Sequence, residues 1–420
     1  MHNQLANRDE QRPQLVPTGG KKRRRKMTIV LLLAVGFLPV LAWLLLTWGG
    51  ILQRIVPLAF TTHQHKQAPA RVPIPLIPQT NAANPGPIAT QIDNLLTAQV
   101  NQQQFSGSVL VARNGQILLS KGYSMANWDK AIPNTPNTRF FLGSVTKEFT
   151  AMALLILQER GKLRVQDSLC SYITNCPQPW SPLTIFELLT HTSGIPELDT
   201  SQLSGASPQD WISSFNNAPL QFTPGNQFEY CSTCYQILAY VVQQASGIPY
   251  SQFVQQNILA PLHMTSSGFD PTSYYSQANS AIGYQSWQVT DPQLGFHMDP
   301  QWSFLDGSGL LYSTVEDLYR WDQALSTNTL VSQATLKQAF TPYVEATLFP
   351  GSQYGFGWFI NQGPHRLIWH DGVIDGFRNF NGRYVNDGIT VIFLSNLSTL
   401  DILPLSHAME KILFGASQGT

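Results

Sequence analysis

The feature that most constrains this chain is an uncharged, apolar run close to its N-terminus. Met27 to Trp48 contains no charged residue, and the basic block KKRRRK at Lys21 to Lys26 comes directly before it. Roughly 20 apolar residues in a helix span the hydrocarbon core of a bilayer. Because Lys and Arg flank one end only, that end is expected to stay in the cytoplasm. The sequence therefore predicts a basic cytoplasmic tail at 1–26 and a single transmembrane signal anchor at 27–48, with the rest of the chain exported.

Two other interpretations of this segment are open. A cleaved signal peptide has a shorter apolar region and a small-residue cleavage site close behind it, whereas Trp48-Gly-Gly-Ile follows here. A nucleic-acid-binding role for KKRRRK requires that the apolar run is not inserted in a membrane. The formal net charge of the chain is zero, so no wider basic field supports that role. We therefore expect a membrane partner and no nucleic-acid partner.

The segment at 49–89 is expected to be an extracytoplasmic linker. Its second half, from Gln67 to Ala89, is rich in Pro, Ala and Asn, a composition typical of an extended, semi-rigid spacer. Folded sequence is expected from about Thr90, because helical spacing of apolar residues begins there. The sequence thus predicts one folded domain at 90–420.

Strand patterns at both ends of this domain flank a helical middle. A hairpin is predicted at 107–123 around Asn114-Gly115, and helices at 91–103, 149–159 and over most of 184–262. Four more strands are expected to begin at Leu367, Gly376, Asn381 and Ile389, separated by Gly or Asn-Asp-Gly turns, before a closing helix at 405–413. We expect an α/β (α+β) fold: an antiparallel sheet flanked by helices, from about 90–150 and 300–420, with an inserted all-helical subdomain at about 151–299.

The cysteines agree with an exported domain. There are four, which allows three pairings; one is the local pairing of Cys170 with Cys176 and of Cys231 with Cys234. A single Cys-x-x-Cys is too little for a zinc site. We expect no metal and no cofactor.

The sharpest chemical feature is Ser144-Val-Thr-Lys147. A serine hydroxyl needs a nearby base to become a nucleophile. If Ser144 opens a helix, Lys147 lies one turn further on the same face, where burial and the helix dipole favour its neutral form. About one such spacing is expected by chance in a chain of this length. The alternative is a capped helix with a solvated lysine.

The sequence around Ser144 favours a catalytic pair over a capped helix with a solvated lysine. It resembles the penicillin-recognising serine hydrolases, in the branch that holds class C β-lactamases, D-alanyl-D-alanine carboxypeptidases and related esterases. The resemblance covers roughly 106–395 and rests on six segments in order, which are the Ser144 segment, Thr184 to Pro196, Phe222 to Ser232, Asp306 to Leu318, Tyr354 to Trp358 and His370 to Phe377.

The resemblance implies a role for each matching residue. Ser144 would be the acylated nucleophile, Lys147 its proton acceptor, and Tyr230 would pass a proton to the leaving group, as a phenolate or through Lys147. His370, Gly372 and Ser232 would bind substrate, with Gly372 leaving room for backbone approach. The oxyanion donors would be the backbone N–H groups of Ser144 and Val373.

The chain departs from the family pattern at two of these positions. Ser232 stands where the family usually has Asn, and His370 replaces the usual Lys of true β-lactamases. A second match to Tyr-x-Asn, Tyr384-Val-Asn386, runs into an Asn-Asp-Gly turn and is interpreted as hairpin structure. His191, in Thr-His-Thr-Ser-Gly, is interpreted as structural.

The sequence thus predicts a membrane-anchored serine hydrolase working through a Ser144 acyl-enzyme. Small peptides, esters or β-lactams are the candidate substrates, with D-alanyl peptidase or esterase activity favoured over β-lactamase activity because of Ser232 and His370 together. The alternative is a catalytically impaired, penicillin-binding-like sensor of the same fold.

Overall fold

The computed structural model describes residues 86–197, 207–287 and 306–415. The expected anchor at 27–48 and nearly all of the expected linker lie outside these ranges. Within them, no helix is both long and apolar enough to cross a membrane.

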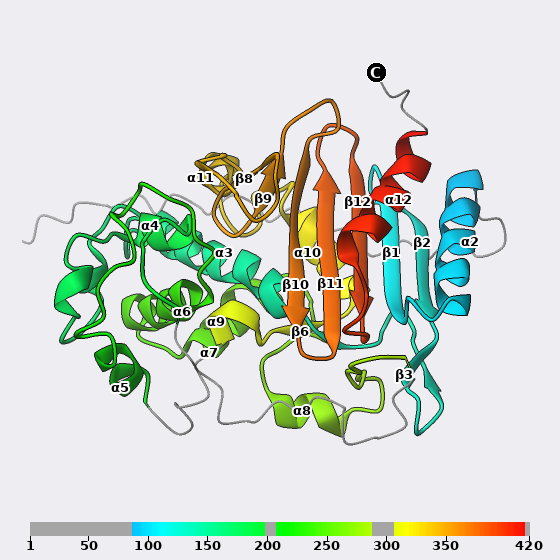
Figure 1. The fold of residues 1–420 in the computed structure, drawn as a ribbon, viewed down its shortest axis with the longest axis horizontal. Coiled ribbons are helices and arrows are strands. Elements are labelled where there is room, and N and C mark those ends of the chain that lie inside the picture. The colour runs from blue at the N-terminus through cyan, green and yellow to red at the C-terminus, as the bar shows by residue number, and fades with distance from the viewer. Residues whose placement is uncertain (1–85, 198–206, 288–305, 416–420) are drawn as a thin grey trace, which may run out of the picture. The chain divides into compact units, whose positions relative to one another are not determined.

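An antiparallel sheet of eight strands, in the order β2-β1-β12-β11-β10-β9-β8-β7, forms the framework (Figure 1). The expected hairpin joins β1 to β2, and Asn114 and Gly115 both have positive φ, as a tight two-residue turn requires. Strand β12 pairs with β1 from Gly107↔Ser395 to Arg113↔Ile389, so the two ends of the domain meet in the sheet. The strands are β1 (Gly107–Arg113), β2 (Gln116–Tyr123), β7 (Val344–Glu345), β8 (Ser352–Tyr354), β9 (Phe359–Asn361), β10 (Leu367–Ile374), β11 (Phe377–Tyr384) and β12 (Ile389–Ser395).

One expected turn is wrong. Asn381-Gly382 does not separate two strands but lies inside the single strand β11. The Asn381 amide is buried and donates to both carboxylate oxygens of Glu148, at 3.2 and 2.8 Å, while a side chain at 382 would collide with the Phe380 ring. A tertiary contact therefore overrides a local turn signal. The second Tyr-x-Asn match, Tyr384-Val-Asn386, is hairpin structure as expected, because β11 ends at Tyr384 and a turn follows it.

Helices cover both faces of the sheet. Helices α2 (Pro87–Asn101) and α12 (Ile402–Phe414) pack together on one face, and α10 (Val315–Ala324) packs against β1 and β12 on the other. The remaining elements are η1 (Gly143–Val145), α3 (Thr146–Glu159), η2 (Leu169–Ser171), η3 (Gln178–Trp180), α4 (Ile185–Leu189), α5 (Pro208–Ser213), α6 (Ser232–Ser246), α7 (Tyr250–Val254), the π-helical turn η5 (Gln255–Leu259), α8 (Pro271–Ser276), α9 (Asp306–Gly309), α11 (Gln333–Ala339), and the short strand pairs β3 (Met125–Asn127) with β4 (Ile132–Pro133) and β5 (Phe140–Phe141) with β6 (Tyr312–Ser313).

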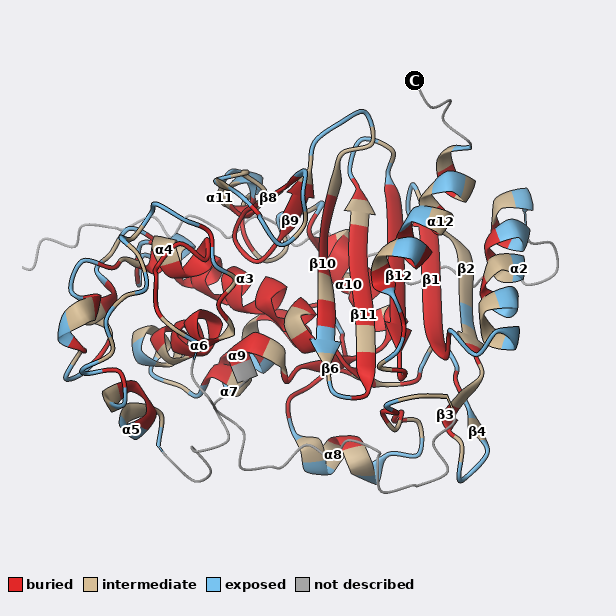
Figure 2. Cartoon of the chain, in the orientation of Figure 1, coloured by how far each residue is buried: buried red, intermediate tan, exposed pale blue. Residues whose placement is uncertain are grey.

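The period-two alternation of the central strands divides the core in two. Val109 and Val111 of β1 face the α2 and α12 side, whereas Leu110 and Ala112 face the larger core shared with the helical part. Figure 2 shows β1 and β12 buried along their length, while α2 and α12 expose their outer faces. The sheet with an inserted helical part is therefore confirmed.

Helix α3 connects the two parts and carries the candidate catalytic lysine. Its residues from Thr146 to Leu157 are all buried. Glu148, 1% exposed, accepts hydrogen bonds from Trp321 Nε1 of α10 at 2.8 Å and from Asn381 of β11. Burial raises the pKa of this carboxyl well above its usual range. These contacts attach the first turn of α3 to the sheet.

Both cysteine pairs are disulfide-bonded locally, Cys170 with Cys176 and Cys231 with Cys234. The local pairing considered from the sequence is thus the one the structure contains.

Candidate active site

Ser144 and Lys147 lie together at the start of α3. Ser144 is in the 3₁₀ turn η1, which runs directly into the helix, and Lys147 is the second helical residue. The Lys147 side chain is fully buried and its Nζ lies 3.0 Å from Ser144 Oγ, whereas Ser144 is partly exposed. The solvated-lysine alternative is therefore wrong, because Lys147 has no access to solvent.

The surroundings of Lys147 favour its neutral form. Burial lowers the pKa of Lys147 to about 7, and the carboxylates of Glu197 and Asp371 oppose this shift. Nζ also donates to the Ser308 carbonyl at 3.0 Å and lies 4.9 Å from the centre of the Tyr230 ring. A substantial fraction of the amine is therefore unprotonated near neutral pH and able to accept a proton.

Tyr230 points its hydroxyl into the same site. This hydroxyl is buried and lies toward the Ser144 hydroxyl. Burial raises the pKa of Tyr230 well above 10, and the charge of Asp371 adds to the increase, while the Ser144 hydroxyl opposes it. The phenol therefore stays protonated at neutral pH.

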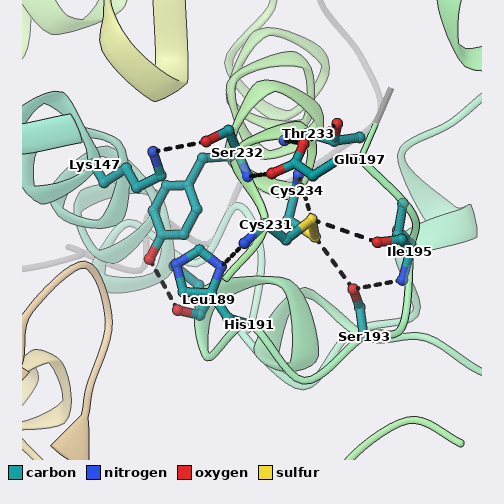
Figure 3. The surroundings of a disulfide bond; sticks show 11 residues. Lys147, Leu189, His191, Ser193, Ile195, Glu197, Cys231, Ser232, Thr233 and Cys234 are labelled. Atoms are coloured by element: carbon teal, nitrogen blue, oxygen red, sulfur yellow. Dashed lines mark hydrogen bonds between the residues drawn. A yellow bond between two sulfur atoms is a disulfide. The ribbon is translucent and has the colours of Figure 1, made fainter. Parts of the chain in front are cut away.

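The segment that carries Tyr230 and Ser232 is braced by the Cys231–Cys234 disulfide at the start of α6 (Figure 3). The backbone N–H of Cys231 donates to His191 Nδ1 at 2.9 Å. The His191 ring lies against Tyr230, with ring centroids 4.4 Å apart. His191 thus supports Tyr230 from behind, in line with its structural interpretation.

Glu197 is a site residue that the sequence reasoning missed. Its carboxylate accepts hydrogen bonds from the backbone N–H of Ser232, from that of Thr233 at 3.0 Å and from the Thr233 hydroxyl at 2.7 Å (Figure 3). An acidic group at a helix N-terminus is stabilising. No local motif marks Glu197, because it caps a helix that begins 35 residues later.

Ser232 keeps part of the contact expected of an asparagine. Its hydroxyl lies 3.5 Å from Lys147 Nζ, at the limit of a hydrogen bond. Ser308 is another contact of Lys147 that was not predicted. Its carbonyl is closer to Nζ, at 3.0 Å. The family resemblance included its segment but implied no role for this residue.

His370 requires a correction. It was expected to bind substrate, but it is 0% exposed, and burial lowers its pKa to about 3. Nδ1 donates to the Asp371 carbonyl at 2.6 Å, and Nε2 accepts from the Tyr354 hydroxyl at 3.1 Å. A neutral, buried imidazole has no charge to offer a substrate carboxylate. The His370 ring packs instead among the rings of Phe359, Tyr354 and Tyr230, with centroids 5.0, 6.0 and 6.1 Å away.

Glycine is also required at position 372 for a different reason from the expected one. A Cβ at 372 would lie 1.8 Å from the Leu142 carbonyl oxygen, so this glycine permits contact between β10 and the turn before Ser144. Gly143, which the sequence reasoning missed, faces it: its φ is +57°, and a Cβ there would lie 2.8 Å from Val373 N. The two glycines bring the backbone of Val373 next to that of Ser144.

The arrangement fits one protein family. A family model described as Beta-lactamase matches residues 92–403. This chain belongs to the beta-lactamase family. PbpX of Bacillus subtilis, a protein named for penicillin binding, is 33% identical to it over 298 residues, which are 70% of this chain and 71% of PbpX. The resemblance identified from the sequence is thereby confirmed.

Solved structures of the family share the fold. A penicillin-binding protein from Bacillus halodurans has a TM-score of 0.64 and 26% identity, with 76% of this chain and 98% of that chain covered. The Beta-Lactamase/D-Alanine Carboxypeptidase from Pseudomonas syringae has a TM-score of 0.69 at 16% identity, covering 79% and 99%. At that identity the second likeness shows the beta-lactamase fold alone.

Proposed function

We propose that this protein is a serine hydrolase that forms an acyl-enzyme on Ser144 and acts on esters, amides or small peptides. One observation carries the proposal: a fully buried Lys147 whose Nζ lies 3.0 Å from the Ser144 hydroxyl. A neutral amine at hydrogen-bond distance is the activation that a serine nucleophile needs.

The proposed reaction uses the neighbouring groups in sequence. Lys147 Nζ accepts the Ser144 proton as Oγ attacks the scissile carbonyl, and the backbone N–H groups of Ser144 and Val373 stabilise the oxyanion. The Tyr230 hydroxyl gives its proton to the leaving group and is reprotonated by the Lys147 ammonium. Water then repeats the sequence on the acyl-enzyme, releasing the acid and free Ser144. Because Tyr230 is protonated at neutral pH and a substantial fraction of Lys147 is not, the lysine is the base in this scheme.

The site is proposed to work outside the cytoplasm, on a tether to the cell membrane. The apolar run at 27–48 behind KKRRRK supports a single-pass anchor, and the Pro-rich stretch up to 89 supports a spacer. D-alanyl peptidase or esterase chemistry is favoured over β-lactam hydrolysis, because the Ser232 hydroxyl reaches Lys147 only at 3.5 Å.

One labelling experiment tests both the nucleophile and its location. Spheroplasts of bacteria that express the full chain are treated with a membrane-impermeant fluorescent fluorophosphonate. We expect labelling of the wild type in intact spheroplasts and none of Ser144→Ala. Labelling only after lysis would contradict the location, and labelling that is equal in the two proteins, or absent from both, would contradict the enzyme and favour a non-catalytic sensor. Turnover of a nitrophenyl ester, a D-Ala-D-Ala peptide and a chromogenic cephalosporin then ranks the substrates.

The Cys231–Cys234 disulfide is expected to matter for catalysis. Replacing both cysteines with serine removes the cross-link that holds Tyr230 and Ser232 in position, and kcat for the nitrophenyl ester should fall about tenfold. Closing so short a loop stabilises the fold by only about 2 kcal/mol, so the variant should still fold. The matched control is Cys170→Ser with Cys176→Ser, a disulfide elsewhere in the domain, which should leave kcat unchanged. Equal kcat for both double variants would contradict the bracing role.

A further inference from the structure

The first turn of α6 is fixed from outside the helix by Glu197. The Glu197 carboxylate accepts hydrogen bonds from the backbone N–H of Ser232, from that of Thr233 at 3.0 Å and from the Thr233 hydroxyl at 2.7 Å (Figure 3). The next N–H of this turn, that of Cys234, donates to Cys231 Sγ at 3.0 Å. First-turn N–H groups have no partner within their own helix, so these bonds fix the backbone that carries the Ser232 side chain.

The Ser232 hydroxyl is one of three serine oxygens around Lys147 Nζ. Ser144 Oγ and the Ser308 carbonyl oxygen each lie 3.0 Å from Nζ, and Ser232 Oγ lies 3.5 Å from it. A neutral amine has two N–H groups to donate and one lone pair with which to accept. The Ser308 carbonyl can only accept, and the Ser232 hydroxyl is placed to accept the second N–H. The lone pair is then left for the proton of Ser144.

The contact between Ser232 and Lys147 is the longest of the three and is at the limit of a hydrogen bond. A small movement of the first turn of α6 away from the lysine is enough to break it. The second N–H of the amine then has Ser144 Oγ as its nearest acceptor, and an amine that donates to Oγ cannot take its proton. The position of this turn therefore decides whether Lys147 faces Ser144 as a base or as a donor.

We propose that Glu197 is a positioning residue that acts through Ser232. By holding the first turn of α6, it keeps the Ser232 hydroxyl where it accepts one N–H of Lys147. The lysine lone pair is thereby directed at Ser144 Oγ. Glu197 transfers no proton itself. This inference rests on the proposed function, since it adds a residue to the same reaction.

The charge of Glu197 acts on the same amine. It raises the pKa of Lys147, against the larger effect of burial, which lowers that pKa to about 7. Without this charge the neutral amine persists to lower pH. Other titratable groups that face Lys147 come from several elements and stay in place when Glu197 is changed; they are Asp371 and His370 on β10, Tyr230 before α6, Tyr235 on α6 and His191 after α4.

Glu197→Gln in the full-length protein tests both effects, with a short-chain nitrophenyl ester as substrate. The amide keeps the size of the side chain but loses its charge, and its NH₂ group cannot accept a hydrogen bond. We expect kcat/KM on the high-pH plateau to fall about tenfold, because the base is less well oriented. We also expect the acid limb of the kcat/KM profile to move about half a pH unit lower.

A second variant tests the route through Ser232. Ser232→Ala removes the hydroxyl and keeps the backbone N–H groups that Glu197 binds, and it should lower plateau kcat/KM about tenfold by itself. In this background, adding Glu197→Gln should lower plateau kcat/KM by less than about twofold, because the contact that Glu197 maintains is already absent. The acid limb should still move lower.

Glu187→Gln is the matched control. Glu187 caps α4 and accepts from the Thr184 N–H at 2.8 Å, and α4 carries no residue of the proposed mechanism. Plateau kcat/KM and the acid limb should both match the wild type.

Three results would overturn this inference and leave the proposed function standing, provided that Ser144 is still labelled by the fluorophosphonate. They are a wild-type plateau in Ser232→Ala, which decides the matter even if Glu197→Gln fails to fold; the same loss from Glu197→Gln with and without the Ser232 hydroxyl; and an acid limb that Glu197→Gln does not move, which would make Glu197 a cap of the fold alone. A wild type that turns over no ester and leaves Ser144 unlabelled would overturn both.

Discussion

Alanine at Ser144 and methionine at Lys147 are each expected to lower kcat/KM for a short-chain nitrophenyl ester by about 10³-fold or more. The first change removes the nucleophile, and the second removes its base while keeping a similar side-chain volume. Because the two residues act as one unit, the double variant should be no worse than either single variant. Additive losses would contradict a shared step.

The pH profile of the wild type identifies the base. The pKa of Lys147 is about 7, so the amine is mostly neutral, and able to accept a proton, above that pH. We therefore expect kcat/KM to rise with pH through 7 and then level off. Below pH 7 the rate should fall about tenfold per pH unit. A profile that is flat between pH 5 and 9 would contradict lysine as the base.

The thermal stability of Lys147→Met shows whether its loss of activity comes from lost chemistry or from lost folding. The folded-state pKa of Lys147 lies below its ordinary value of 10.5, so the unfolded chain binds the proton more tightly between pH 7 and 10.5. The buried amine therefore costs stability at pH 7, and this cost lessens as the pH rises. Lys147→Met removes it, so its Tm should equal or exceed that of the wild type. A lower Tm would show that the loss of activity includes a loss of folding.

Gly372→Ala is expected to lower kcat/KM by about 10²-fold and to destabilise the fold by about 3 kcal/mol. The added Cβ would lie 1.8 Å from the Leu142 carbonyl oxygen, so β10 and the turn before Ser144 must move apart. A displacement of about 1 Å at a reacting group commonly costs about 10²-fold in rate. Ester turnover and urea denaturation of the purified protein measure the two effects.

Gly86→Ala provides the matched control for this change. Gly86 has φ −62°, and nothing lies within 4 Å of a Cβ built there. Activity and stability should both be retained. If Gly372→Ala behaved like this control, the close contact between β10 and the Ser144 turn would not be what holds the site together.

Local patterns predicted the elements but not their partners. Asn114-Gly115 gave the right hairpin because both residues tolerate positive φ, whereas the same dipeptide at 381–382 is part of a strand. The difference is Glu148, a buried carboxyl more than 200 residues away in sequence that binds the Asn381 amide. A local signal cannot register a partner so distant along the chain.

The sequence by itself determined the residues that could react. Ser144 and Lys147 are three positions apart at the start of a helix, and helical geometry alone puts them on one face. Only the tertiary structure decided their state: burial beneath Ser308 and Tyr230 neutralises the lysine, burial of His370 removes its charge, and Glu197 and Asp371 bring two carboxylates to the site. Burial and electrostatics depend on everything packed around a group, and that packing joins segments separated by tens to hundreds of residues.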